Sequence, residues 1–468
     1  MKSAFQKKRR SFQNRKGTSV RWSKLGVYLL LYVVTLCLFL SPIVLHPHQL
    51  NSILLQILRL IIICFATILL AKYTIYMIFC PFYELQTAKK KRYTRQFLYE
   101  PLVSVLIPAW NEEVGLLSTV KTVLESDYPR LEIVVVNDGS TDRSDEIMRH
   151  FVARYEQETQ GVASIPTILY HYQPNGGKGS ALNTAIGLSH GEILVSIDAD
   201  CAVHPHAISA FVRCFQDWTV MAAVGNVRVG NTRTLIGTLQ YLEYLFSFYF
   251  KKADSILNTI YIIGGAAGAF RRDVFERIGG YSTKNITEDI DLSVRIQKAG
   301  MRIVYAPGAV VYTEGASTIT GLMKQRLRWK RGRFQTFREH RSLFFSTRAE
   351  HNKLLTWVIL PLAVFGDVQL GCEPFFILLL YLFSWLTQDF SAFLSGLMVV
   401  SFIFFVQMLD DASHRRLPYL LLAPIGWMLF YITTFVEFYA LIVSLWYIIS
   451  RRDLKWQKWQ RKGVTDTI

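Results

Sequence analysis

Residues 193–200 read Ile193-Leu194-Val195-Ser196-Ile197-Asp198-Ala199-Asp200, an apolar run that closes on two carboxylates. A run this rich in Ile and Val is typical of a strand buried on both faces of a mostly parallel sheet. Two carboxylates at the end of such a strand repel each other and lose solvation, and a divalent cation relieves both effects. Asp198 and Asp200 are therefore candidate ligands of Mg²⁺ or Mn²⁺, which favour oxygen donors. The alternative is an ordinary solvated turn.

Two similar runs precede this one, Val103–Ile107 and Glu132–Val136. Helical patterns lie between the runs, near residues 113–125, 141–155 and 179–189. This alternation predicts an α/β domain with a mostly parallel sheet over residues 100–345.

Polar residues follow each predicted strand, where open α/β sheets bind ligands. Pro108-Ala109-Trp110-Asn111-Glu112 follows the first strand, and Asn137-Asp138-Gly139 follows the second. The carboxylate of Asp138 is a candidate acceptor for a base or a ribose. Gly176-Gly177-Lys178-Gly179 opens a helix, where backbone N–H groups and a lysine attract phosphate. Each motif alone also fits a simple turn, with Asn111 as a helix cap.

Two further motifs lie near the end of the domain. Thr287-Glu288-Asp289-Ile290-Asp291 opens a helical pattern that runs to Gly300. Acids at a helix N-terminus stabilise the helix, and Thr287 is a candidate cap, but one of these carboxylates is also a candidate general base. Gln325-Arg326-Leu327-Arg328-Trp329 lies in a basic amphipathic stretch that predicts an interfacial helix. In a functional role, its Trp would stack on a sugar and an Arg would face a diphosphate.

Apolar segments flank the domain. Leu25–Leu45 is uncharged and long enough to cross a hydrocarbon core of ~30 Å, and Ile53–Phe82 is a second candidate span. Residues 354–450 contain further apolar segments, which we expect to be transmembrane or interfacial helices, with breaks near Pro361 and Pro374. The basic residues place both chain ends and the α/β domain inside, so we expect a multi-pass protein of the plasma (inner) membrane with a cytoplasmic domain.

The net charge of +17 comes mostly from the two ends of the chain. Residues 1–24 hold nine Lys or Arg and no acid, and residues 451–468 hold six basic and two acidic residues. Both ends flank apolar segments, so this charge indicates a membrane surface, and no nucleic-acid-binding module is recognisable. The six cysteines form no CxxC pair and favour neither a disulfide framework nor a zinc site.

In this order, the motifs resemble those of processive family 2 glycosyltransferases, the synthases of cellulose, chitin, hyaluronan and poly-β-1,6-N-acetylglucosamine. Those enzymes carry an acidic turn, a DxD, a TED and a QxxRW motif between membrane helices. The matching segments here are Asp138, Asp198–Asp200, Thr287–Asp289 and Gln325–Trp329. Within the family, the chain is most similar to the bacterial poly-β-1,6-N-acetylglucosamine synthase, including the stretches Gly225–Arg228, Thr232–Leu235 and Gly264–Arg272. Asn137 replaces the first acid of the DDG-like turn.

The resemblance implies a Rossmann-like GT-A domain at 100–345 between N-terminal (25–82) and C-terminal (354–450) membrane segments. It also implies a UDP-sugar donor, Mg²⁺ or Mn²⁺, and an inverting reaction that extends a growing polysaccharide and moves it across the bilayer. By resemblance, Asp289 is the base with Glu288 beside it, and Asp200 and Asp198 hold the metal. The remaining implied roles are donor binding by Pro108, Asn111, Glu112, Asp138, Lys178, Asp198 and Arg328, and acceptor binding by Gln325 and Trp329.

Several alternatives stay open. The best match for the donor is UDP-N-acetylglucosamine, but the motifs fit chitin, cellulose or hyaluronan synthesis equally well. A non-processive transferase acting on a lipid acceptor is a further alternative, although such enzymes usually lack the Gln-x-x-Arg-Trp element. We expect no cyclic-dinucleotide-binding barrel after residue 450, and regulation by a small membrane partner subunit is compatible with the sequence.

Overall fold

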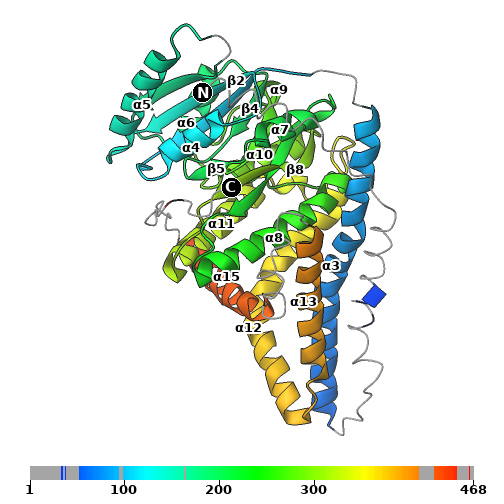
Figure 1. Ribbon diagram of the computed structural model, residues 1–468. Coiled ribbons are helices and arrows are strands. Elements are labelled where there is room, and N and C mark those ends of the chain that lie inside the picture. The colour runs from blue at the N-terminus through cyan, green and yellow to red at the C-terminus, as the bar shows by residue number, and fades with distance from the viewer. Residues whose placement is uncertain are drawn as a thin grey trace.

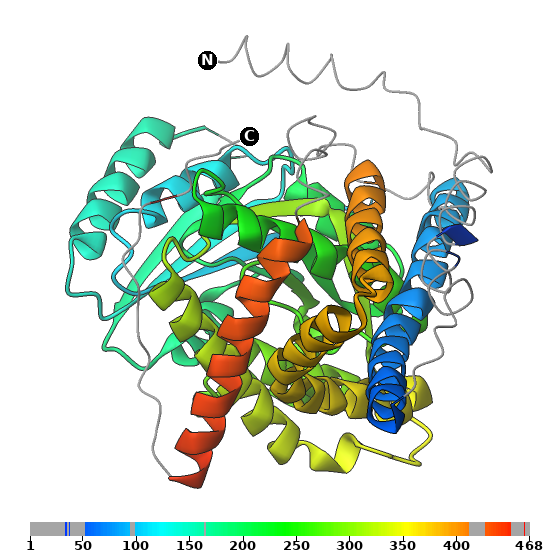
Figure 2. The same ribbon diagram turned by 90° about the horizontal axis from the view of Figure 1, so that it is seen from below.

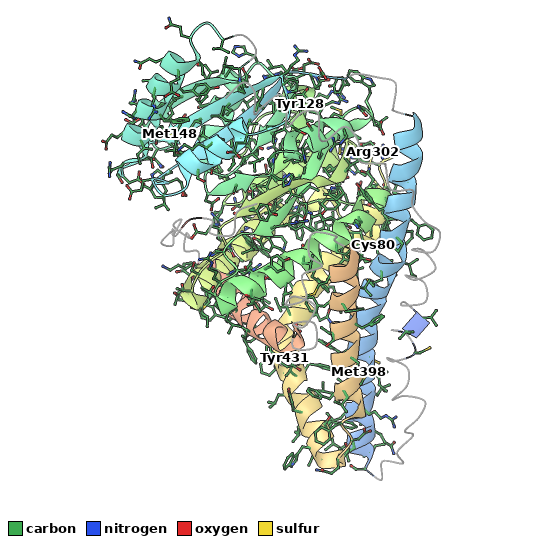
Figure 3. All side chains as sticks on the ribbon, viewed as in Figure 1. Cys80, Tyr128, Met148, Arg302, Met398 and Tyr431 are labelled. Carbon is green, nitrogen blue, oxygen red and sulfur yellow. The ribbon has the colours of Figure 1, made fainter. Side chains whose placement is uncertain are left out.

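The computed structural model describes residues 33, 34, 37, 52–93, 99–162, 165–410, 426–450 and 463. A sheet domain lies at one end, and a group of long helices extends from it (Figure 1). Tyr128 and Met148 lie in the sheet domain, Met398 and Tyr431 lie in the helical part, and Cys80 lies near the junction (Figure 3).

Eight strands form one mixed sheet in the order β3-β2-β1-β4-β7-β6-β8-β5. The strands are β1 (Val103–Ala109), β2 (Leu131–Asp138), β3 (Thr167–Gln173), β4 (Ile193–Ser196), β5 (Cys201–Val203), β6 (Val220–Val229), β7 (Gly268–Arg271) and β8 (Arg302–Thr313). Strand β1 pairs in parallel with β2 and with β4, and β2 pairs in parallel with β3. In contrast, β7 runs antiparallel to both β4 and β6. The sequence-based prediction of buried parallel strands at 103–107, 132–136 and 193–197 is confirmed.

The helices of the sheet domain cover both faces of the sheet. They are α4 (Leu116–Leu124), α5 (Ser144–Thr159), α6 (Lys178–Leu188), α7 (Ala207–Cys214), α8 (Leu235–Leu257), α9 (Arg272–Ile278), α10 (Glu288–Lys298) and α11 (Ile319–Glu339). Two buried apolar clusters result, one on each side of the sheet. One contains Val105, Ile133 and Phe211, and the other contains Leu106, Val134 and Leu182. Because successive strand residues point to opposite faces, a strand that is apolar at every position contributes side chains to both clusters.

From β1, the chain adds β2 and then β3 on one side of the sheet, and it then returns to add β4 on the other side of β1. The order of the strands therefore reverses at β1. Parallel strands end at the same edge, so the chain segments after β1, β2 and β4 leave the sheet together. Such a switch point is where open α/β sheets form a ligand-binding crevice. Pro108 and Asp138 lie in the last residues of β1 and β2, and Asp198 follows the end of β4 by two residues, so these predicted site residues lie at this edge of the sheet.

The helical part consists of α3 (Ile53–Tyr93), α12 (Leu360–Thr387), α13 (Ser391–Asp410) and α15 (Gly426–Ile449). Seen from below, α3, α12 and α13 stand together, while α15 lies beside α11 under the sheet domain (Figure 2). Among the described residues, two stretches are long and apolar enough to cross a membrane, Leu355–Thr387 and Tyr431–Ile449. Among the described side chains of α3, Ile53–Phe65 forms a shorter apolar stretch. The predicted span at Leu25–Leu45 lies outside the described residues, apart from Val33, Val34 and Cys37.

The break expected near Pro374 is wrong, because α12 continues through this residue after a π-helical turn at Leu355–Ile359. Proline removes one N–H, which would otherwise bond the carbonyl of Leu370. An apolar helix supported by neighbouring helices tolerates such a loss. The freed carbonyl belongs to a residue that lines the cavity described below.

Candidate active site

A cavity of about 970 Å³ opens at the switch point of the sheet. Its wall includes residues from all six sequence motifs, although these motifs are spread over more than 200 positions of the chain. Eleven predicted site residues line it: Pro108, Glu112, Asp138, Lys178, Asp198, Asp200, Glu288, Asp289, Gln325, Arg328 and Trp329. The structure therefore brings together nearly every residue that we selected from the sequence.

Asn111 is the exception, since it does not line this cavity. Its backbone adopts a left-handed conformation with φ of 53°. Its side-chain Oδ1 accepts hydrogen bonds from the backbone N–H and the hydroxyl of Thr141 at 2.7 and 3.3 Å. These bonds agree with the alternative role of Asn111 in organising a turn, and direct donor binding by Asn111 stays a prediction.

Asp138 holds the glycine-rich loop against the end of β2. Its Oδ1 accepts bonds from Gly176 N (2.9 Å) and Gln173 Nε2 (2.7 Å), and its Oδ2 accepts one from Gly177 N (2.8 Å). Gly177 has φ of 86°, a conformation that favours glycine, and it is followed by the first residue of α6, Lys178. Asp138 thereby fixes the position of Lys178 in addition to forming part of the cavity wall.

Lys178 stands among carboxylates. Its Nζ lies 2.6 Å from Asp198 Oδ1 and 3.2 Å from Glu288 Oε1. A methyl group at position 265 would lie 2.6 Å from Lys178 Nζ and at ordinary contact distances from Asp289 Oδ2 (3.5 Å) and Asp198 Oδ1 (3.7 Å). A larger residue at this position would therefore have to displace the flexible end of Lys178.

Asp289 sits in the first turn of α10. Its Oδ1 accepts a bond from Ile290 N (2.8 Å), and its Oδ2 accepts one from Gly265 N (2.8 Å). Burial raises the pKa of Asp289 to about 6, and the nearby charge of Glu288 acts in the same direction. The expected cap at Thr287 is not formed, because this side chain makes no cap hydrogen bond and instead approaches Asn285 Oδ1 at 3.3 Å.

The acidic residues at the cavity fit a divalent cation. Asp198, Asp200, Glu288 and Asp289 all line it, and Lys178 is the cation that pairs with two of them. Asp200 is only 8% exposed. Hard oxygen donors in a partly buried, anionic wall suit Mg²⁺ or Mn²⁺.

Gln325 and Trp329 lie one turn apart on α11 and both face the cavity. Gln325 is 5% exposed, and within the described part of the chain its Oε1 accepts no hydrogen bond. A buried amide oxygen without a partner is costly, and a ligand hydroxyl would satisfy it. The guanidinium of Arg326 stacks at 4.4 Å from the centroid of the Trp329 ring, which restricts the ring orientation.

The acidic residues that hold α11 in place are not among the site residues predicted from the sequence. Arg326 pairs with Glu243 of α8 (2.6 Å) and with Glu437 of α15 (3.3 Å). Lys330 pairs with Glu437 and with Asp367 of α12, both at 2.9 Å. Asp367 and Glu437 are acids within apolar segments, and such residues usually mark a functional or paired position. That signal was available in the sequence.

The family described as "Glycosyltransferase like family 2" matches residues 101–332, which contain all six motifs, from Pro108 to Trp329. The chain belongs to glycosyltransferase family 2 and is an enzyme of that family.

Three curated relatives each match between half and two thirds of this chain. The probable glycosyltransferase YdaM of Bacillus subtilis is 34% identical over 50% of this chain and 55% of its own length. The poly-beta-1,6-N-acetyl-D-glucosamine synthase of Staphylococcus epidermidis is 26% identical over 65% of this chain and 73% of its own. The beta-monoglucosyldiacylglycerol synthase of Nostoc sp. is 28% identical over 58% of each chain. The match thus spans little more than half the length of two of these relatives.

A solved structure supports the fold. The mannosyltransferase PcManGT from Pyrobaculum calidifontis, in complex with GDP-Man and Mn²⁺, superimposes with a TM-score of 0.51. The alignment covers 85% of this chain and all of the mannosyltransferase, at 21% identity. The sheet domain therefore has a GT-A-like fold.

Proposed function

We propose that this enzyme polymerises a UDP-sugar, best matched by UDP-N-acetylglucosamine, into a β-linked exopolysaccharide and passes the product across the plasma membrane. The observation that carries the proposal is the set of residues that line the cavity. The same cavity that gathers the carboxylates of the sheet domain continues to polar residues on α12 and α15. The similarity to the staphylococcal synthase supports the choice of sugar.

The part of the cavity beside the apolar helices is lined by polar groups. Gln369 and Glu373 of α12 face it, as do Thr433, Thr434 and Glu437 of α15. Thr434 and Glu373 also contact each other, with 3.3 Å between Oγ1 and Oε1. Polar residues in apolar segments typically face a pathway or a partner rather than lipid. A hydroxyl-rich polymer leaving the active site would find hydrogen-bond partners there.

The proposed transfer is a single displacement. The acceptor hydroxyl oxygen attacks the anomeric carbon, the bond from that carbon to the diphosphate oxygen breaks, and its electron pair leaves with UDP. Asp289 takes the proton of the acceptor hydroxyl, so an α-linked donor gives a β-linked product. Lys178 and Arg328 would place positive charge near the leaving diphosphate. A cation held by Asp200 and Asp198 would add Lewis-acid stabilisation of that leaving group.

For the membrane, we propose that residues 25–82 and 354–450 anchor the domain, with residues 1–24 and 451–468 at the cytoplasmic surface. The basic residues of these end segments support this orientation. Polymer synthesis would then use cytoplasmic UDP-sugar, and the growing chain would leave along α12 and α15.

The full chain in lipid nanodiscs, supplied with UDP-N-acetylglucosamine and Mn²⁺, tests the proposal. We expect UDP release coupled to a long product that a β-1,6-N-acetylglucosamine hydrolase digests. Cleavage of the product only by chitinase would indicate a chitin synthase. Polymer made only from UDP-glucose would indicate a cellulose synthase. A requirement for two different donors would indicate hyaluronan. No UDP release with any of these donors would contradict the proposal.

A second candidate is transfer of one sugar to a lipid acceptor, which the relative from Nostoc sp. favours. Diacylglycerol and UDP-glucose added to the same nanodiscs would then give a glycolipid and no polymer. Product length on a gel separates the two candidates directly.

The pH dependence of transfer follows from the environment of Asp289. Because burial and Glu288 raise its pKa to about 6, the carboxyl is protonated below that pH and cannot accept a proton. We expect kcat to be constant above about pH 7 and to fall about tenfold per unit below pH 6. The variant Glu288→Gln removes a neighbouring negative charge, so the acid limb should move to lower pH. A kcat that stays constant down to pH 4.5 would exclude Asp289 as the base.

A further inference from the structure

One face of α11 serves two parts of the site. Gln325, Trp329, Gly332, Thr336 and His340 follow one another at intervals of three or four residues, so they share a face of the helix. The first two line the cavity. The other three contact Thr287, Asn285 and Asp291 in the loop and helix that carry Asp289. The position of the acceptor-binding face is therefore linked to the position of the proposed base.

The first contact is a close packing of the two segments. A Cβ atom added at Gly332 would overlap the side chain of Thr287, two residues before Asp289. Thr287 is 4% exposed and β-branched, so it has little freedom to move away. Only glycine at position 332 permits this approach of α11 to the start of α10.

The second contact is polar and buried. The side-chain amide of Asn285 donates to the Thr336 hydroxyl (3.0 Å) and approaches Glu339 Oε2 (3.3 Å). The Oδ1 of the same Asn285 accepts a bond from Thr287 N (3.0 Å). Asn285 thus joins the backbone just before Asp289 to the C-terminal half of α11.

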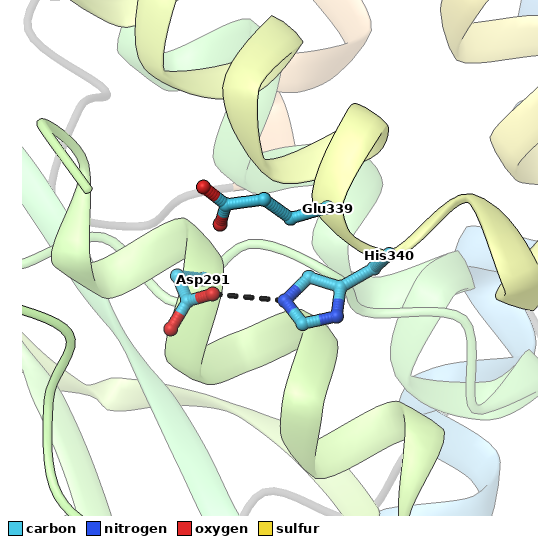
Figure 4. Close-up of side chains that lie close together, drawn as sticks. All are labelled: Asp291, Glu339 and His340. Carbon is cyan, nitrogen blue, oxygen red and sulfur yellow. Dashed lines mark hydrogen bonds and ion pairs between the residues drawn. The ribbon is translucent and has the colours of Figure 1, made fainter. Parts of the chain in front are cut away.

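The third contact is an ion pair or charge-assisted hydrogen bond. His340 Nε2 lies 2.8 Å from Asp291 Oδ1, so this pair joins the end of α11 to α10, with Glu339 of α11 beside it (Figure 4). On its other side, Asp291 Oδ2 accepts from Arg295 Nε at 2.8 Å. Arg295 also donates to the carbonyls of Ile278 and Gly280, which anchors Asp291 to the domain.

The same three side chains could be mistaken for a metal site. Ligand atoms of Asp291, Glu339 and His340 lie within 4.8 Å of one another. However, Arg295 already supplies positive charge to Asp291, and the amides of Asn285 and Gln335 face Glu339 at 3.3 and 3.0 Å. These donors occupy the oxygens that a cation would need.

We propose that Asn285, Asp291, Thr336 and His340 form an α10–α11 latch that sets the distance between Asp289 and the acceptor held at Gln325 and Trp329. These are positioning residues, since none of them is assigned to touch the reacting atoms. The inference rests on the proposed roles of Asp289 and α11. Misplacement of reacting groups by about 1 Å costs up to ~10²-fold in rate, so the latch affects turnover more than donor binding.

The test compares His340→Ala with the rescue variant His340→Gln in nanodiscs, with Mn²⁺ and saturating UDP-N-acetylglucosamine. The amide of Gln can replace the Nε2 donor toward Asp291. We expect His340→Ala to lose about tenfold or more in kcat, with an unchanged Kd for UDP, and His340→Gln to recover most of it. The matched control is His206→Ala, which removes a surface His–Asp pair with 2.6 Å between His206 Nδ1 and Asp127 Oδ2 and should keep the original kcat.

A second variant covers the case in which His340→Ala does not fold. Thr336→Val keeps the shape of the side chain and removes only the hydroxyl that meets Asn285, and we expect about a threefold or larger loss in kcat at unchanged Kd for UDP. An unchanged kcat in both His340→Ala and Thr336→Val overturns the latch. A loss of kcat that His340→Gln does not restore also overturns it. So does a loss of activity that is explained by weaker binding of UDP. Full activity of Asp289→Asn would instead overturn the assigned base.

Discussion

Asp289→Asn is expected to lower the rate of sugar transfer by about 10²–10⁴-fold, the usual contribution of a general base. The amide has nearly the same shape as the carboxylate, and its oxygen can still accept a bond from Gly265 N, which now meets Asp289 Oδ2 at 2.8 Å. It cannot take a proton from the acceptor. UDP binding should stay within about threefold of the original, because the proposed role of this residue is in the chemical step.

The chain offers a matched control for this variant. Asp273 lies in the first turn of α9, as Asp289 does in α10, but it is exposed and does not line the cavity. Asp273→Asn removes a similar helix-terminal charge and should leave transfer unchanged. Polymer made at the normal rate by Asp289→Asn, measured as UDP release and product length, would show that another group accepts the proton.

Asp200→Ala is expected to weaken metal-dependent UDP binding and to lower kcat by about 10²-fold or more, as loss of electrostatic stabilisation of a leaving group does. Asp200 is almost fully buried at the cavity wall, in the segment between β4 and β5. Removing its carboxylate takes away one of the two proposed oxygen ligands and leaves the other, Asp198, paired with Lys178.

The control for Asp200→Ala is the metal itself. The Kd for UDP is measured by calorimetry with Mn²⁺ and again with excess EDTA, for the original protein and for the variant. We expect the two proteins to differ with Mn²⁺ and to agree in EDTA. Equal affinities in both conditions would mean that Asp200 does not hold the cation, and a difference only in EDTA would mean that its role is structural.

Much of the fold could be predicted because strands that are buried on both faces of a sheet are continuous apolar runs in the sequence. Val103–Ile107, Glu132–Val136 and Ile193–Ile197 are apolar at nearly every position, and only a central strand requires this. The continuous α12 could not be predicted with the same rule. Pro374 normally ends a helix, and its tolerance here depends on neighbouring helices that lie far away in the sequence.

The site shows a similar division. Motifs that combine several chemical types, such as Thr287-Glu288-Asp289, were visible in the chain, and the structure places them at one cavity. The partners of each charge were not visible. Lys178 was selected as a phosphate ligand, yet it also pairs with Asp198 and Glu288, and Glu437 holds Arg326 from 111 positions away. Sequence spacing reveals which groups can react, but tertiary packing decides which of them meet.

The pairing of α11 with α12 and α15 has a consequence for how the enzyme can be divided. A chain cut at residue 345 would keep every motif and every strand of the sheet. It would nevertheless lose Asp367 and Glu437, which face Arg326, Lys330 and Arg333, together with one wall of the cavity. The sheet domain and the apolar helices are therefore not interchangeable modules, and exchanging the helices between relatives should require exchanging α11 with them.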